Sequence, residues 1–176
     1  MAGKTSFGLG VSNVGAPNTG VTAYEYGTGK SHTTVLVVNQ VDALTLADGA
    51  AIADGYLLYT FPAGNILING AMMSMAPTAA DSLLQAAATE AGIGSVIASG
   101  AVAVLSGTGT FEDVITGQVG VIDGTADAAA VTTARAILTA GAKTIHYNLA
   151  MASTVADGAD LSCDIAGTVT INWSTM

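Results

Sequence analysis

Two segments of this sequence alternate apolar and polar residues with a period of two, and no other feature restricts the fold as strongly. The segments are residues 144–149, with Ile145, Tyr147 and Leu149 as the apolar set, and residues 168–173, with Val169, Ile171 and Trp173. A period of two places alternate side chains on opposite faces of a strand, so each segment predicts a strand with one buried face. Asp157-Gly158, between them, favours a turn, and we therefore expect the two strands to lie antiparallel.

Further strands are indicated upstream. Residues 33–41 are apolar on both sides of the pleat, which is typical of a strand in the middle of a sheet. Residues 56–61 and 65–75 flank Pro62-Ala63-Gly64, whose residue types favour a tight connection, and the two segments predict a hairpin. Short β-branched segments separated by turn signals are typical of a sandwich or a barrel, and 176 residues favour one domain.

Helix is expected to be a minor component. Residues 78–91 have Thr78 as an N-cap candidate, apolar residues at helical spacing, and Gly92 as a stop. Residues 110–116 predict a single turn with Phe111, Val114 and Ile115 facing inward. Neither segment is long enough to define the fold, so an all-β class with one or two short helices is expected.

The first 32 residues have no sustained periodicity, yet they contain apolar side chains. We expect an extended N-terminal arm (residues 1–32) that becomes ordered on a neighbouring subunit, followed by a β-sandwich domain (residues 33–176). The candidate partner-binding residues of the arm are Phe7, Leu9, Val11, Val14, Val21, Tyr24 and Tyr26. Two alternatives stay open, namely a disordered leader and a strand folded onto its own domain.

Charge is scarce and mostly negative. Charged residues make up 10% of the chain, against about 25% in an ordinary soluble domain, and 13 acidic residues outnumber four basic ones. Because clustered Lys and Arg are needed to bind phosphates, we expect neither nucleic acid nor an anionic membrane as a partner. A surface of Ala, Thr, Ser and Gly suits contact with other proteins. The N-terminus lacks a secretion signal, so we expect synthesis in a cytoplasm.

Tests for catalytic or cofactor sites give nothing specific. Residues 27–31 end like a phosphate-binding loop, but Tyr24 stands where the motif needs Gly, and a strand pattern follows. His32 and His146 are far apart in sequence, and we expect His146 to be exposed or at an interface. We expect Cys163 to be an unreactive, small apolar residue. We therefore expect no enzyme, no cofactor and no catalytic residue.

Calcium is the metal with some support, because acidic residues lie close along the chain in two places. These residues are Asp123 and Asp127, and then Asp157, Asp160 and Asp164. Neither place matches a known calcium loop, and Asp in turns usually bonds its own backbone. We expect structural turns and no metal.

Several stretches resemble the small head proteins of tailed bacteriophages. They are the strand 143–149 with the closing Gly-Thr-Val-Thr-Ile-Asn-Trp at 167–173, the stretch Leu57–Gly70, and Gly92-Ile93-Gly94 followed by residues 111–115. The resemblance covers residues 33–176. It implies a capsid decoration or cement protein: an antiparallel β-sandwich, often of jelly-roll type and often trimeric, that binds the major capsid protein on the outer head surface and bridges capsomers.

Two other functions stay open. One is a different repeating phage part, such as a minor head or tail-tube subunit. The other is a carbohydrate-binding β-sandwich module on a fibre, which would need an exposed aromatic patch. For a decoration protein the resemblance implies a homo-oligomer, with a trimer favoured.

Overall fold

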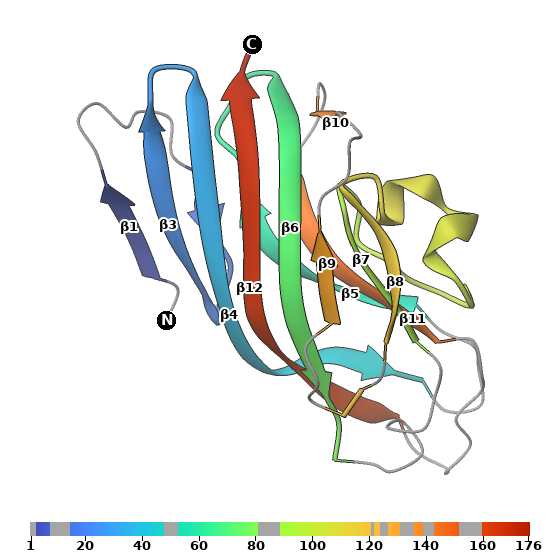
Figure 1. The fold of residues 1–176 in the computed structure, drawn as a ribbon. Coiled ribbons are helices and arrows are strands. Elements are labelled where there is room, and N and C mark those ends of the chain that lie inside the picture. Colours follow the sequence, from blue (N-terminus) through green and yellow to red (C-terminus); the bar gives the residue numbers. More distant parts are fainter. Residues whose placement is uncertain are drawn as a thin grey trace.

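The chain forms strands over most of the residues that the structure describes. The computed structural model describes residues 3–7, 15–47, 53–80, 89–120, 122–123, 127–130, 136–138, 143–151 and 160–176. The strands are β1 (Gly3–Phe7), β2 (Ala16–Pro17), β3 (Val21–Thr28), β4 (Ser31–Leu46), β5 (Ala53–Thr60), β6 (Ile66–Thr78), β7 (Thr89–Gly94), β8 (Ile115–Gly120), β9 (Asp127–Ala130), β10 (Ala136–Leu138), β11 (Thr144–Met151) and β12 (Leu161–Thr175) (Figure 1).

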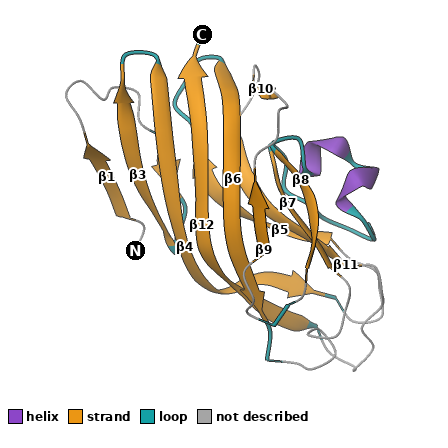
Figure 2. Cartoon of the chain, in the orientation of Figure 1, coloured by secondary structure: helices purple, strands orange, loops and turns teal. Residues whose placement is uncertain are grey.

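The strands form two sheets that pack face to face, so the predicted all-β sandwich is confirmed. One sheet has seven strands in the order β1-β3-β4-β12-β6-β10, with β9 also paired to β6, and the other has five in the order β2-β5-β11-β7-β8. Every pairing is antiparallel except that of β1 with β3. Helical structure among the described residues is limited to two 3-10 turns, η1 (Leu105–Gly107) and η2 (Gly109–Phe111) (Figure 2).

The strand order is that of a jelly roll. From β4 onward the chain pairs as one long folded hairpin: β4 with β12, β5 with β11, β6 with both β9 and β10, and β7 with β8. Successive pairs fall into alternate sheets, because the hairpin is wrapped around the core. This double-sheet arrangement leaves each long strand covered on one side by the opposite sheet.

Strands β1 and β3 extend the larger sheet beyond the jelly roll, and they correct the predicted division at residue 32. That boundary lies inside the β3–β4 hairpin, in which Val21 pairs with Val38 and Thr28 with Ser31. Val21 and Ala23 lie in the core of their own chain. Residues 21–28 are therefore a strand of the domain, which was the alternative to an arm.

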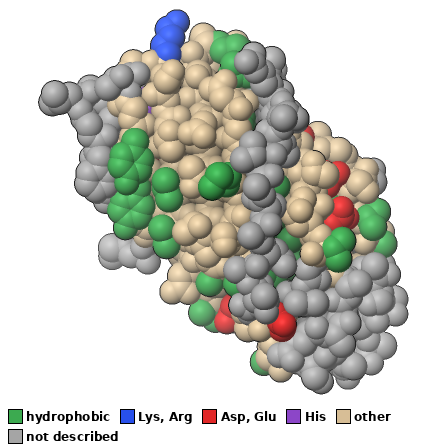
Figure 3. Space-filling model, in the orientation of Figure 1, with side chains coloured by type: hydrophobic (Ala, Val, Ile, Leu, Met, Phe, Trp, Pro, Cys, Tyr) green, Lys and Arg blue, Asp and Glu red, His purple; other side chains and the backbone are tan. Residues whose placement is uncertain are grey.

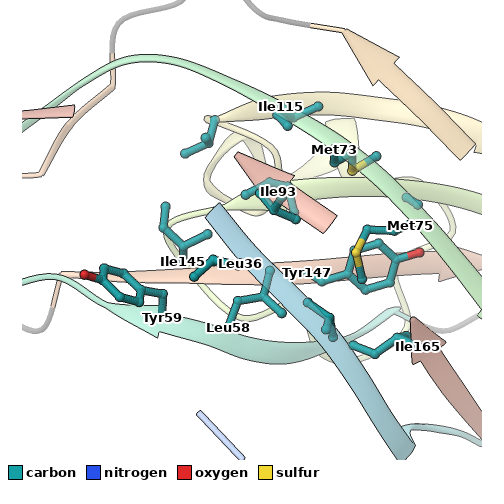
Figure 4. Packing of buried hydrophobic residues seen from close by; sticks show 14 of the residues in the cluster. Leu36, Leu58, Tyr59, Met73, Met75, Ile93, Ile115, Ile145, Tyr147 and Ile165 are labelled. Atoms are coloured by element: carbon teal, nitrogen blue, oxygen red, sulfur yellow. The ribbon is translucent and has the colours of Figure 1, made fainter. Parts of the chain in front are cut away.

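The core lies between the sheets, and both contribute large side chains to it. Leu36 on β4, Met73 and Met75 on β6, and Ile165 on β12 meet Leu58, Ile93, Ile115, Ile145 and Tyr147 from the smaller sheet and its borders (Figure 4). Trp173 is fully buried, as predicted, and its ring packs edge-on against Phe61 with centroids 5.2 Å apart. The apolar sets of β11 and β12 face this core, which confirms the faces inferred from their alternation.

Two predicted strand pairings are wrong. The segments on either side of Pro62-Ala63-Gly64 are β5 and β6, and they lie in different sheets, so the connection is a crossing from one sheet to the other. The same is true of β11 and β12, which are not paired with each other. A tight turn sequence reverses the chain but does not specify whether the next strand joins the same sheet.

The predicted helix at 78–91 is wrong at both ends. Thr78 is the last residue of β6, and residues 89–91 belong to β7, while residues 81–88 lie outside the described part of the chain. The predicted turn at 110–116 is confirmed in part, because η2 ends at Phe111 and Phe111, Val114 and Ile115 are buried. Within the described residues, no helix has the length and apolar character needed to cross a membrane.

Candidate docking surface

Among the side chains that the structure describes, none on the central part of the outer side of the seven-stranded sheet is charged. Alternate residues of β3, β4, β6 and β12 point away from the core there, and we call them together the neutral face. They are Thr22, Tyr24, Tyr26, Thr33, Val35, Val37, Asn39, Asn69, Met72, Ser74, Ala76, Ala166, Thr168, Thr170 and Asn172. Figure 3 views this side, and the red and blue side chains visible there lie toward the margins.

Apolar and hydroxyl-bearing side chains are interspersed across this face. Tyr24, Val35, Thr170 and Met72 are register partners in one row over four neighbouring strands. Three large apolar side chains of the face are well exposed: Tyr26 at 44%, Val37 at 40% and Met72 at 51%. A flat, uncharged surface of this kind desolvates at low cost, which is what a protein-binding surface requires.

A polar cluster lies directly beneath the neutral face and connects the two sheets. The Tyr59 hydroxyl of β5 donates to the Glu25 carboxylate of β3, and the backbone N–H of Gly15, next to β2, contacts both, at 2.7 Å from the Tyr59 oxygen and 3.2 Å from Glu25 Oε1. Glu25 and Tyr59 are fully buried. Burial, and then the neighbouring carboxylate, raise the pKa of Tyr59 well above its usual value. The cluster fixes the edge of the face against the opposite sheet.

His32 occupies the end of the same cluster. Its ring stacks on that of Trp173, with centroids 4.1 Å apart and an angle of 11° between the planes. Trp173 Nε1 donates to Thr34 Oγ1 at 2.8 Å. Neither ring nitrogen of the buried His32 has a hydrogen-bond partner among the described residues. Stacking therefore determines the position of this imidazole.

The opposite side of the molecule is covered by residues 95–114, which connect β7 to β8 and which we call the β7–β8 excursion. Three glycines of the smaller sheet allow it to approach the strands. A Cβ added at Gly94 would lie 2.4 Å from the Phe111 backbone, one at Gly55 would lie 3.0 Å from Ala98 N, and one at Gly92 would lie 3.2 Å from Leu105 Cδ1. The excursion thus needs glycine beneath it, and it forms a second small core from Ala53, Ala98, Leu105, Phe111 and Ala150.

Polar side chains fasten this excursion to the sheet. Asn148, fully buried on β11, accepts from Ala98 N at 2.9 Å and donates to the carbonyls of Val96 at 2.9 Å and Phe111 at 2.8 Å. Asp113 accepts from both the N–H and the hydroxyl of Ser95. Glu90 accepts from Leu105 N at 2.7 Å. Sequence reasoning did not identify Asn148 as an anchor, because a polar residue on an alternating strand is normally solvated.

Elsewhere, acidic side chains also bond backbone N–H groups. Asp54 accepts from Thr45 N at 2.7 Å, Asp164 from Asp42 N at 2.8 Å, and Glu112 from Gly117 N at 2.6 Å. These carboxylates stabilise turns and strand ends away from the neutral face.

The candidate arm residues have three different environments. Val21 is buried in its own core, so it is not available to a partner and that assignment is wrong. Tyr24 and Tyr26 point outward on the neutral face, Tyr24 partly and Tyr26 substantially exposed. Phe7 lies on β1, whose backbone pairs with β3. Leu9, Val11 and Val14 lie outside the described residues.

All three residues tested for chemistry, His32, His146 and Cys163, are buried. His146 was expected to be exposed or at an interface; it is buried, because the β7–β8 excursion covers the outer face of β11. Burial lowers the pKa of His146, opposed by the Gly94 backbone and by Asp113. Cys163 is buried, and burial raises the pKa of its thiol to about 12. At neutral pH that thiol is protonated and a poor nucleophile.

The glycine-rich stretch considered for nucleotide binding is a turn between two strands. Gly29-Lys30 forms the turn of the β3–β4 hairpin, and β4 follows directly, so the strand predicted after this glycine-rich stretch is confirmed. Within the described residues, no three His, Cys, Asp or Glu side chains are grouped in a way that could hold a metal ion. Asp157 lies outside these residues.

Comparisons with protein-family models, with curated proteins and with solved structures find no match to this chain.

Proposed function

We propose that this protein is a non-catalytic structural subunit, a capsid decoration or cement protein that docks through its neutral face on the outer head surface of a tailed bacteriophage. The observation that carries the proposal is the absence of charge from that face in a chain with a net charge of −9. A subunit this acidic repels copies of itself over most of its surface, and its neutral face is the place where close contact costs least.

The partner in this proposal is the major capsid protein. Docking on a shell adds binding free energy to the closed state of the joints that the subunit bridges. The jelly roll supports the proposal by analogy only, since the same fold serves viral capsid and lectin domains. A homo-oligomer, with a trimer favoured, would strengthen such docking because several tethered contacts act together.

The alternative within the same class is another repeating head or tail subunit. It would use the same neutral face in a different symmetry. Imaging of virions that carry the labelled protein distinguishes the two, because the label lies over the head surface in one case and along the tail in the other.

The test is to mix the purified protein with undecorated heads and to measure occupancy by electron cryomicroscopy and co-sedimentation. Val37→Glu places one charge in the middle of the neutral face, and we expect it to lower the apparent affinity at least about ten-fold, since a buried unpaired carboxylate is costly. Val119→Glu is the matched control, because Val119 on β8 is 85% exposed and lies outside the face. Equal binding by both variants, or no binding by the unmodified protein, would refute the proposal.

Truncation of residues 1–30, which the arm hypothesis suggests, is not a suitable test. It would remove β3, expose the edge of β4 and delete Val21 and Ala23 from the core. Point substitutions on the face leave the fold intact, and so they separate docking from folding.

A further inference from the structure

An open pocket of about 310 Å³ lies at the end of the neutral face where β3 and β4 turn. Its lining includes Tyr26, Thr33, Asn69 and Asn172, together with His32 and Trp173. Tyr26, Thr33 and Asn172 are register partners on three adjacent strands, which are spaced about 4.8 Å apart. The row therefore extends about 10 Å across the sheet. No residue that lines the pocket is Asp, Glu, Lys or Arg.

A β-bulge places two amides side by side in this pocket. Asn172 of β12 pairs with Gly70, and Trp173 pairs with Ile68, so Asn69 is the extra residue on β6. Bulges of this kind redirect a side chain. Here the bulge leaves Asn69 exposed beside Asn172, which is also exposed.

The neighbouring side chains fix what each amide offers to a ligand. Thr33 Oγ1 donates to Asn172 Oδ1 at 2.7 Å, so the Nδ2 group of Asn172 points away as a donor. Asn69 Nδ2 donates to Ser174 Oγ at 2.9 Å, so the Oδ1 atom of Asn69 remains as an acceptor. One donor and one acceptor side by side match a vicinal diol, since each hydroxyl both donates and accepts.

Tyr26 supplies the apolar part of the same site. Its ring is 44% exposed and belongs to the row that contains Thr33 and Asn172. An exposed aromatic ring offers a flat apolar surface with a polar tip, which suits the C–H face of a sugar ring. The absence of charge from the lining favours a neutral ligand over a phosphorylated or carboxylated one.

We propose that this pocket binds a neutral oligosaccharide, with one sugar ring against Tyr26 and a vicinal diol between the amides of Asn172 and Asn69. The inference goes beyond docking on a shell, and sugar binding in solution is measured separately from attachment to heads, although the pocket belongs to the neutral face. Shape complementarity, stacking on Tyr26 and hydrogen bonds between neutral groups would hold the sugar, so we expect a dissociation constant in the micromolar to millimolar range.

The experiment is a calorimetric titration of the full chain with neutral hexasaccharides of glucose, mannose, xylose and N-acetylglucosamine, with hexagalacturonate as the charged comparison. Fluorescence of Trp173, the single tryptophan, gives an indirect second readout, because its buried ring stacks on His32 next to the pocket. The variants are Tyr26→Ala, which removes the ring, and Thr33→Val, which keeps the shape but frees Asn172 to rotate. Val41→Ala is the control, since Val41 is 63% exposed on β4 and does not line the pocket.

We expect at least one neutral hexasaccharide to bind, Tyr26→Ala to weaken binding at least about ten-fold, Thr33→Val to weaken it about three-fold, and Val41→Ala to leave it unchanged. The inference is overturned if no neutral hexasaccharide binds at about 10 mM, if hexagalacturonate binds as well as the best of them, or if Tyr26→Ala has no effect. Loss of sugar binding with intact attachment to heads would leave the proposed docking function in place.

Discussion

The hydroxyl of Tyr59 donates a hydrogen bond to the buried carboxylate of Glu25, and this bond joins the two sheets through a polar contact inside the core. Replacing Tyr59 by Phe removes the donor and leaves the carboxylate with the Gly15 N–H as its remaining partner at Oε1. A buried charged group that loses a partner costs about 3 kcal/mol. We therefore expect Tyr59→Phe to lower the free energy of unfolding in urea by about that amount.

Tyr56→Phe is the control for this prediction. The Tyr56 hydroxyl donates to the Thr19 carbonyl at the surface, where water replaces the lost partner, so the expected cost is below about 1 kcal/mol. Equal losses for the two variants would mean that the Glu25 contact contributes nothing specific.

Asn148→Ala should release the β7–β8 excursion. The substitution removes three hydrogen bonds to Val96, Ala98 and Phe111 and leaves their backbone groups unsatisfied, at a total cost of about 3 kcal/mol. Hydrogen exchange should then increase at the Ala98 amide and remain unchanged in β12. Gln118→Ala serves as the comparison, because the Gln118 side-chain amide donates to the carbonyls of Thr116 and Gly117, which are its neighbours along the chain. Unchanged protection of Ala98 would contradict the anchoring role of Asn148.

Gly94→Ala should be destabilising although Ala is the smallest possible addition. Its Cβ would lie 2.4 Å from backbone atoms of Thr110 and Phe111, and backbone cannot move aside cheaply. We expect a loss of about 2 kcal/mol by thermal or urea unfolding. Gly109→Ala adds the same atom where nothing lies within 4 Å, and it should cost less than about 0.5 kcal/mol. A tolerated Gly94→Ala would show that the excursion does not pack as described.

His146 should make the protein less stable in mild acid. Burial lowers the pKa of His146 in the folded state, so below its ordinary value of 6.5 the unfolded chain binds a proton that the folded chain resists. Stability therefore falls as the pH decreases through 6.5. Urea unfolding of the natural chain and of His146→Gln at a series of pH values isolates this contribution as the difference between the two curves. Parallel curves from neutral pH to pH 5 would rule it out.

The faces of the long strands were predictable because their alternation is strong. Ile171 and Trp173 occupy every second position with polar residues between them, and both lie in the core. The central place of residues 33–41 followed from apolar character on both sides of the pleat. These are local signals, and they are reliable when a strand is long enough to repeat them.

The sheet to which each strand belongs was not predictable from the same signals. Pro62-Ala63-Gly64 gives a tight connection both in a hairpin and in a crossing between sheets, and the pairing of β5 with β11 depends on residues about 90 positions apart. Contacts at that separation have no local sequence signature.

One residue obscured the alternation of strand β3 in the sequence. Val21 and Ala23 point into the core in the expected alternation, but Glu25 continues the same face, and a carboxylate at a core position disguises the pattern. Its partner Tyr59 lies 34 residues away, so the sequence alone does not reveal that the charge is accommodated. Asn148 is a similar case, for which the nearby glycines of Gly92-Ile93-Gly94 were the available signal.

Strand β12 lies between β4 and β6 at the centre of the larger sheet, although it follows all other strands along the chain. On a ribosome, β4 and β6 must therefore wait with unpaired edges until β12 emerges, and such edges are prone to associate with other chains. We therefore expect slow folding from this order of strands. A change in Trp173 emission as β12 inserts would show when the edges of β4 and β6 become paired and can no longer associate with other chains.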